Sequence, residues 1–149
     1  VIVFGWPVLL FLVVHNFFAW MQLTSANYIE HYGLLRMRKD NGKYERCQPH
    51  HSWNANHLFS NLMLFQLERH SDHHANPSRP FQSLRSFEDL PELPAGYFTM
   101  YLIAYFPPLW FKVMNQRVVD LPHIRGDFSK INLDPSKAEE LKAKYSVGG

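Results

Sequence analysis

The feature that most constrains this 149-residue chain is an apolar start without charge. The 15 basic and 13 acidic residues all lie at or after Glu30. Pro7 to Ala26 is a stretch of 20 mostly apolar residues, and a helix of about that length crosses about 30 Å of hydrocarbon. We therefore expect a membrane-spanning helix here. The alternative is a buried core helix of a soluble domain, which can show the same run.

Local signals give this helix predicted bounds. A turn is predicted at Gly5, and Pro7 suits the first helical turn, where its missing N–H is not needed. Residues 1–4 would then be the end of a preceding span. The helical pattern continues to Gly33, a typical end signal. Such a rod is about 39 Å long, so its lower end is expected to carry His31 out of the membrane.

A basic segment follows that end of the helix. The positive-inside rule makes this side cytoplasmic. Asn41-Gly42 predicts a hairpin, because both positions of such a turn need positive φ. The basic residues favour either docking of an acidic electron carrier or topology alone, and both interpretations stay open. These residues are Arg36, Arg38, Lys39, Lys43 and Arg46.

A second helix is predicted from about Asn54 to His74, capped by Ser52 or Asn54. Its apolar residues form one stripe, and Asn56 shares another face with His70. Four prolines make residues 75–95 irregular. Residues 96–119 are aromatic, are broken at Pro107-Pro108, and suit a helix that lies at the interface or packs on the protein.

Residues 120–149 are expected to form a tail with a short helix. Asp134 is predicted to cap this helix, and Pro135 is predicted to open it.

Seven of the nine histidines fall between His31 and His74. On a helix, His70, His73 and His74 stand at spacings of three and four, so their imidazoles can converge. Imidazole is a common ligand for iron, zinc and copper, and His31 is the natural fourth ligand. A solvated polar helix end is the bland alternative. The spacing does not decide between iron and zinc.

Four further residues are candidates to support these ligands. Glu30 and Asp72 adjoin them in sequence and could accept hydrogen bonds from imidazoles. His51 lies in the approach loop, as a supporting or a surface residue, and Asn56 lies on the predicted face of His70. His15 is about 24 Å up the first helix and cannot share the same metal.

Composition excludes several classes of protein. A content of 46% hydrophobic and 15% aromatic residues excludes a disordered chain. The lone Cys47 excludes a disulfide scaffold, a zinc ribbon and an iron–sulfur protein. The scattered basic residues, offset by 13 acidic ones, argue against a nucleic-acid binder. The chain also begins inside an apolar run, so we expect a piece of a longer protein.

Two segments resemble the last two histidine motifs of the integral-membrane alkane 1-monooxygenases. They are NYIEHYGL at Asn27–Leu34 and LERHSDHHA at Leu67–Ala75, and PHHSWN at Pro49–Asn54 is similar to the family too. The resemblance runs from about residue 5 to 119. The HxxHH pattern alone is shared with membrane desaturases and other hydroxylases, whereas both motifs in this order are more specific.

This resemblance implies an all-α membrane protein: the C-terminal part of a six-helix transmembrane bundle with a cytoplasmic histidine-rich metal domain and a small hairpin. Its expected regions are 1–4, 5–33, 34–95, 96–119 and 120–149. It implies a non-haem di-iron site with His31, His70, His73 and His74 among the ligands. The other ligands would come from upstream motifs that this chain lacks, so the chain alone should be inactive.

The implied enzyme hydroxylates the terminal carbon of medium-chain n-alkanes. It uses O2 and electrons from rubredoxin and rubredoxin reductase, in the bacterial inner membrane. Acid–base side chains cannot attack an unactivated C–H bond, so this chemistry requires a metal and O2. A xylene-type methyl hydroxylase or a fatty-acyl desaturase is the nearest alternative. A non-catalytic membrane metal-binding module is the alternative from another class.

Overall fold

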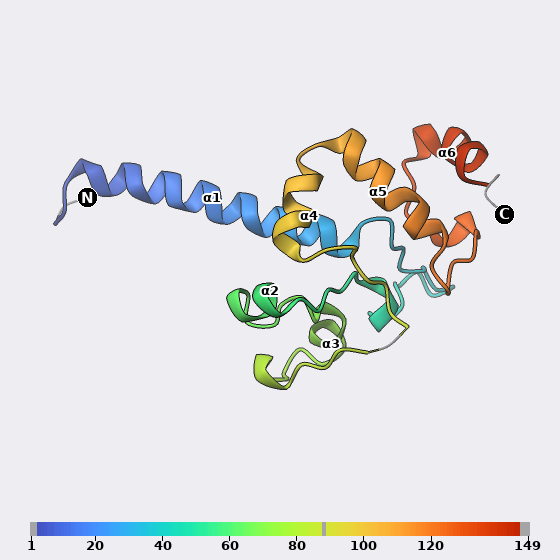
Figure 1. The fold of residues 1–149 in the computed structure, drawn as a ribbon, viewed down its shortest axis with the longest axis horizontal. Helices are drawn as coiled ribbons and strands as arrows, with labels where there is room; N and C mark the ends of the chain where they lie inside the picture. Colours follow the sequence, from blue (N-terminus) through green and yellow to red (C-terminus); the bar gives the residue numbers. More distant parts are fainter. Residues whose placement is uncertain (1–2, 88, 147–149) are drawn as a thin grey trace.

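The computed structural model describes residues 3–87 and 89–146 (Figure 1). A long helix extends from one end, and the other elements gather around its C-terminal half. Within the described ranges there is no β-strand, and three isolated bridges, such as Leu34 with Ile131, join separate segments. The expectation of a mostly helical fold is therefore confirmed. The predicted preceding span at residues 1–4 lies partly outside the described residues, and Val3 and Phe4 form a turn.

Helix α1 spans Trp6–His31, with Gly5 before it and a proline in its first turn. It is the one helix in the described ranges that is long and apolar enough to cross a membrane, and an 18-residue window of it buries nothing. Its buried residues, Ala26, Ile29 and Glu30, all lie near its C-terminal end. The helix therefore divides into a bare apolar rod and a last turn that is built into the protein.

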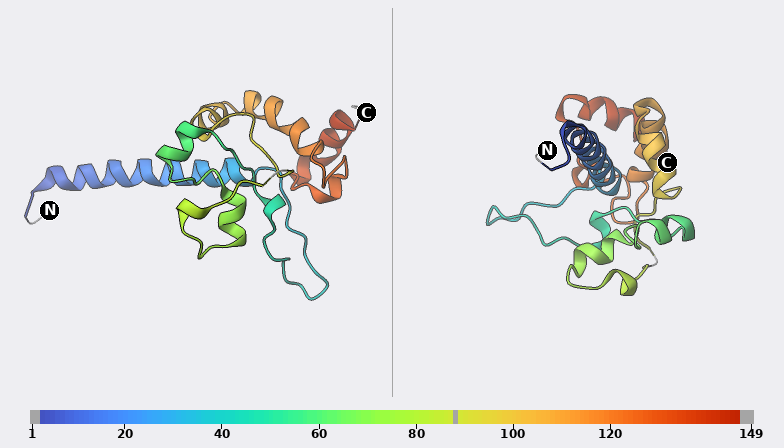
Figure 2. Two further views of the ribbon diagram at one scale, coloured as in Figure 1. Left: turned by 60° about the horizontal axis from the view of Figure 1, so that its bottom comes forward. Right: turned by 90° about the vertical axis from the view of Figure 1, so that its left-hand side faces the viewer.

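The segment after α1 forms the predicted hairpin, which projects away from the helices (Figure 2). The Lys39 N–H donates to the Lys43 carbonyl, and the Gly42 N–H donates to the Lys39 carbonyl. Gly42 has φ of +77°, whereas Asn41 is not among the positive-φ residues. The loop is therefore a three-residue turn that ends in a left-handed glycine, not the two-residue turn expected from Asn-Gly.

The single helix predicted from Asn54 to His74 is wrong. The structure has two short helices, α2 at Leu58–Met63 and α3 at His70–Ala75. Phe65 and Gln66 between them have φ of +50° and +59°. A helix cannot continue through left-handed residues, so the chain reverses here. The apolar periodicity on which the prediction rested contains no signal for this break.

The predicted caps of that helix are also wrong. α2 begins after His57, without a capping side chain. The Asn54 side chain instead donates to Ser71 Oγ at 2.6 Å and accepts the Ser71 N–H at 2.9 Å. Asn54 therefore joins the segment before α2 to the histidine helix α3.

The aromatic segment forms two helices, α4 at Tyr97–Ala104 and α5 at Pro107–Val119. The predicted break at Pro107-Pro108 is confirmed, because α5 begins at the first of these prolines. α4 packs on α1 and on α5. Fully buried side chains from both helices, including Tyr97 and Trp110, form the core together with Ile29 of α1 and Trp53.

The C-terminal segment ends in helix α6, Ala138–Tyr145, which a 3₁₀ turn at Pro135–Lys137 precedes. Asp134 accepts the Ser136 N–H, so the predicted cap and opening proline are present, one turn before the α-helix itself. Three further 3₁₀ turns lie at Pro49–His51 (η1), Phe81–Ser83 and Phe128–Lys130.

Candidate metal centre

His31 ends helix α1 and is held there by its neighbours. Gly33 has φ of +72°, and a side-chain carbon placed on it would lie 2.9 Å from Val118. Only glycine meets both conditions at this position. Trp53 then closes over the helix end, because its backbone N–H donates to the Glu30 carbonyl and its ring N–H donates to the Tyr32 carbonyl. These contacts fix the last turn of α1 and therefore the position of the His31 backbone.

Helix α3 presents His70 and His74 to this helix end. The Nε2 atom of His70 lies 3.4 Å from His31 Nε2 and 2.8 Å from His74 Nε2. One nitrogen of each of the three residues lies within 4.8 Å of the others. In the described part of the chain, this is the group with the geometry of a metal site. Two of its histidines come from one helix turn, and the third comes from another helix 39 residues earlier.

His73, the fourth predicted ligand, is beside this group but outside it. Its ring centroid is 6.1 Å from that of His70 and 5.8 Å from that of His74. Its side chain is exposed. The structure thus brings together three of the four predicted ligands and leaves His73 facing outward from the same helix turn.

Two of the predicted supporting residues contact the group. Glu30 Oε2 lies 3.3 Å from His70 Nε2, the nitrogen that converges with the others. Glu30 is therefore at the edge of the candidate metal position and not behind an imidazole ring. His51 acts through its backbone, because its carbonyl lies 3.1 Å from His31 Nδ1. That contact fixes the ring so that Nε2 of His31 faces α3.

The other two supporting candidates lie elsewhere. The buried Asp72 carboxylate accepts hydrogen bonds from Arg79, Asn76 and the Arg85 N–H, so it holds the following loop against α3. Asn56 accepts from Asn61 at 2.9 Å. The break between α2 and α3 removes the helix face that Asn56 was predicted to share with His70.

Burial makes the group electrically distinctive. Desolvation, followed by the nearby His74, His31 and His73, lowers the pKa of His70 to about 2. Desolvation, followed by the nearby His31, His73 and Arg36, lowers the pKa of His74. Both imidazoles are therefore neutral near pH 7, and a neutral imidazole offers the lone pair that a metal requires. Burial and the negative charge of Glu30 raise the pKa of Tyr97, so its hydroxyl stays protonated.

Sequence reasoning missed the residues that position α3. Glu68 is fully buried, and its carboxylate accepts the N–H groups of His57 and Tyr97 at 3.1 and 2.8 Å. Ser71 donates to the Pro49 carbonyl at 2.6 Å. These bonds join α3 to the segments before α2 and α4. The sequence signal that could have revealed this role was a charged residue, Glu68, two positions before the first histidine of α3.

A second histidine group lies nearby. The His50 ring centroid is 4.2 Å from that of His51 and 4.9 Å from that of His123. The His51 nitrogens are already used: Nδ1 accepts the Gln48 N–H, and Nε2 lies 3.2 Å from Glu45 Oε1. The ring of His123 lies against that of His50, 73 positions earlier in the chain. These rings form a packed group without convergent nitrogens.

The predicted docking residues are exposed on or beside the hairpin. Arg36 donates to the Glu45 carbonyl, and Arg38 donates to the Gly42 carbonyl. These bonds leave both guanidinium charges unneutralised. Among the described residues, Lys39, Lys43 and Arg46 also form no ion pair with a carboxylate. The hairpin is thus an exposed surface on which five basic residues outnumber Asp40 and Glu45.

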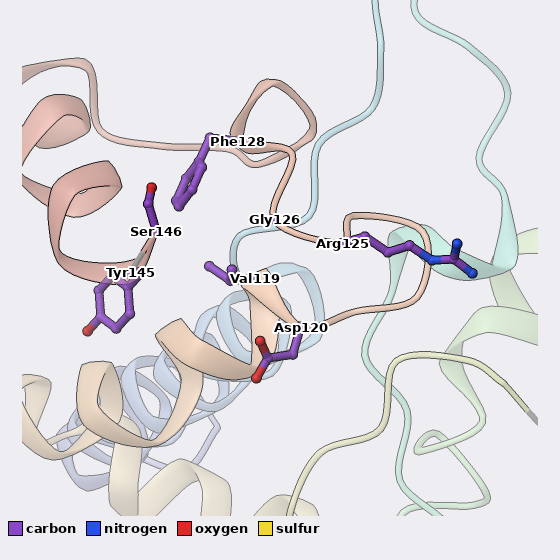
Figure 3. Close-up of a pocket in the computed structure, with 7 residues that line it drawn as sticks. All are labelled: Val119, Asp120, Arg125, Gly126, Phe128, Tyr145 and Ser146. Carbon is purple, nitrogen blue, oxygen red and sulfur yellow. The ribbon is translucent and has the colours of Figure 1, made fainter. Parts of the chain in front are cut away.

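One cavity lies away from the histidines, between the end of α5 and α6 (Figure 3). Its volume is about 450 Å³, and its lining includes Asp120, Arg125 and Tyr145. No histidine lines it. The metal-binding geometry and this cavity are therefore separate features.

Comparison with known proteins gives consistent relatives. The chain is 53% identical over 146 residues to alkane 1-monooxygenase 1 of Alcanivorax borkumensis, which covers 98% of this chain and 36% of that protein. It is 52% identical over 144 residues to alkane 1-monooxygenase of Ectopseudomonas oleovorans, covering 97% of this chain and 35% of that protein. The chain spans about a third of the length of the curated relatives it matches.

A more distant relative is the xylene/toluene monooxygenase hydroxylase component XylM of Pseudomonas putida. It is 31% identical over 130 residues, covering 85% of this chain and 31% of that protein. The family model described as fatty acid desaturase matches residues 1–110, which include α1, α3 and all three converging histidines. The chain therefore belongs to the fatty acid desaturase family.

Proposed function

We propose that this chain is part of a non-haem di-iron membrane monooxygenase that hydroxylates the terminal carbon of medium-chain n-alkanes. The observation that carries the proposal is the convergence of His31, His70 and His74 at the end of an apolar helix. The identity of about 50% to alkane 1-monooxygenases supports the choice of substrate class.

The residues fit a metal ion. Three imidazoles converge, and the buried Glu30 Oε1 has no hydrogen-bond partner in the described part of the chain. His31, His70 and His74 would hold iron, and His73 would hold a second ion or complete the first. The remaining ligands would come from sequence outside these 149 residues. When bound, iron supplies the activation of O2 that an unactivated C–H bond requires.

The chain's own residues hold this site in position. The His51 carbonyl fixes the tautomer and orientation of His31, while Glu68, Ser71 and Asn54 fix α3. Glu30 places a carboxylate beside the converging nitrogens, where negative charge stabilises a bound cation. The buried aromatic layer of Tyr97, Trp53 and Trp110 keeps water from the inner side of the site.

In this proposal α1 is one of several transmembrane helices of a six-helix bundle in the bacterial inner membrane. The basic residues of the hairpin support a cytoplasmic position for the metal centre, by the positive-inside rule. The exposed cations of the hairpin would dock rubredoxin, an electron carrier that we propose is reduced by rubredoxin reductase. Complementary charge at such a surface speeds encounter.

A second candidate function is hydroxylation of an aromatic methyl group, favoured by the 31% identity to XylM. Product analysis of the full-length enzyme with n-octane, m-xylene and an acyl substrate separates the candidates. We expect 1-octanol as the principal product, with His70→Ala as the inactive control. Preferential oxidation of xylene or desaturation of the acyl chain would contradict the proposal.

A further inference from the structure

Helix α2 buries its polar residues and exposes its apolar ones. Its buried residues, Ser60 and Asn61, are polar. Its exposed residues are apolar: Leu58 is 78% exposed, Phe59 69% and Leu62 71%. Met63 and Phe65 are also exposed, at 58% and 66%. A helix in water buries its apolar face and exposes its polar one, so the outer face of α2 is suited to an environment other than water.

The surroundings of α2 share this character. No Asp, Glu, Lys or Arg occurs from residue 47 to 67 or from residue 93 to 111. Phe98 of α4 lies against Phe59, with ring centroids 6.0 Å apart, and Leu102 of α4 is 66% exposed. Together α2 and the outer side of α4 form an exposed apolar surface, which we call the α2–α4 surface. Contiguous apolar patches of this kind mark interaction sites.

The α2–α4 surface continues the bare apolar rod of α1. α4 packs directly on α1, and both α2 and α4 lie at the level of the C-terminal half of α1 along its axis (Figure 1 and the left view of Figure 2). α1 has 26 residues, and at about 1.5 Å each it outruns a hydrocarbon core of about 30 Å by several residues. α2 and α4 are therefore level with the region where α1 leaves the hydrocarbon.

We propose that the α2–α4 surface is inserted in the lipid bilayer, so that the histidine domain is anchored by α2 as well as by α1. The occupant is the acyl-chain region of the lipids. Short apolar helices in this position enter the headgroup and acyl boundary by about 5–10 Å. An uncharged surface suits hydrocarbon, because a charge there would be costly. Only six residues separate α2 from the histidine helix α3.

Depth-dependent fluorescence quenching tests this proposal on the full-length protein in lipid vesicles. With Cys47, the lone cysteine of the sequence, replaced by serine, a fluorophore is attached at Phe59→Cys and, separately, at Leu62→Cys. Asn41→Cys in the hairpin is the aqueous control, and Val13→Cys in α1 is the membrane control. We expect doxyl-labelled lipids to quench the probes at 59 and 62, and iodide to leave them unchanged.

Each other outcome overturns the proposal. Quenching by iodide at positions 59 and 62 would place α2 in water. Shielding from both quenchers would place another protein segment over it. The inference rests on the proposed function only through α1 as a membrane span. If lipid quenches Val13→Cys but not Phe59→Cys, the inference alone fails, whereas an unquenched Val13→Cys removes the span as well. No turnover is needed for this readout.

Discussion

The molecule contains two groups of three histidines, and they differ in what their nitrogens contact. In the group of His31, His70 and His74, one ring nitrogen of each residue lies within 4.8 Å of the other two. In the group of His50, His51 and His123, the rings pack at similar distances, but the His51 nitrogens contact Gln48 and Glu45. Closeness of rings alone therefore does not give the geometry of a metal site, whereas convergence of one nitrogen from each ring does.

The largest expected effect is on the converging group. His70→Ala in the full-length enzyme should lower octane hydroxylation by more than about 100-fold, since even residues behind a metal ligand are worth about 10- to 100-fold. His50→Ala removes a ring of equal size from the second group and should leave turnover within about threefold. Equal losses in both variants would erase the distinction between the groups.

Glu30→Gln asks whether the carboxylate beside the group contributes charge. Glutamine keeps the shape but replaces the carboxylate, whose Oε2 lies 3.3 Å from His70 Nε2, with an amide that cannot ionise. We expect a loss of about 10- to 100-fold in metal affinity, measured by competition with a chelator. An unchanged affinity would assign Glu30 a packing role only. Glu139→Gln, on the exposed face of α6, is the matched control.

Ser71→Ala tests whether the converging group depends on its scaffold. The change removes the hydroxyl that joins the Asn54 side chain to the Pro49 carbonyl. Loss of such a buried bond costs about 1–3 kcal/mol, which thermal unfolding of the full-length protein should register as a lower midpoint. Ser83→Ala, whose hydroxyl bonds only to nearby Pro80, should have little effect. Similar shifts in both variants would count against the scaffold.

The smallest predicted effect concerns the hairpin next to the second histidine group. Reversing two charges, Lys39→Glu with Lys43→Glu, should raise the KM for the reduced electron donor at least about threefold at low salt. Turnover with a small chemical reductant should not change. Lys137→Glu with Lys144→Glu reverses two charges in and just before helix α6 and should not raise that KM. The same KM in all three proteins would favour topology as the role of the basic residues.

Local signals explain why the bounds of α1 and the spacing of the α3 histidines could be predicted from sequence. Pro7 and Gly33 mark the ends of α1 within a residue or two, because a missing N–H and a positive φ act locally. His70 and His74 lie on one helix turn whether the helix is long or short. The grouping of His31, His70 and His74 therefore did not depend on the length predicted for the helix that carries His70 and His74.

The features that were missed depend on contacts between distant segments. Left-handed Phe65 and Gln66 carry no residue-type signal, since such a conformation normally favours glycine. From sequence alone, Glu68 is expected to be an exposed charge. Its burial depends on the N–H groups of His57 and Tyr97, which only the fold places beside it. His123 meets His50 only through the fold. His51 acts through a carbonyl that every residue has, so its identity could not reveal that role.

The most direct measurement is the iron content of the purified full-length protein, compared between His74→Ala and His123→Ala. Each variant removes one imidazole, the first from the converging group and the second from the packed one. We predict that His74→Ala loses iron relative to the parent protein, while His123→Ala retains the parent's iron content. Full iron content in His74→Ala, or an equal loss in His123→Ala, would contradict the assignment of the metal centre.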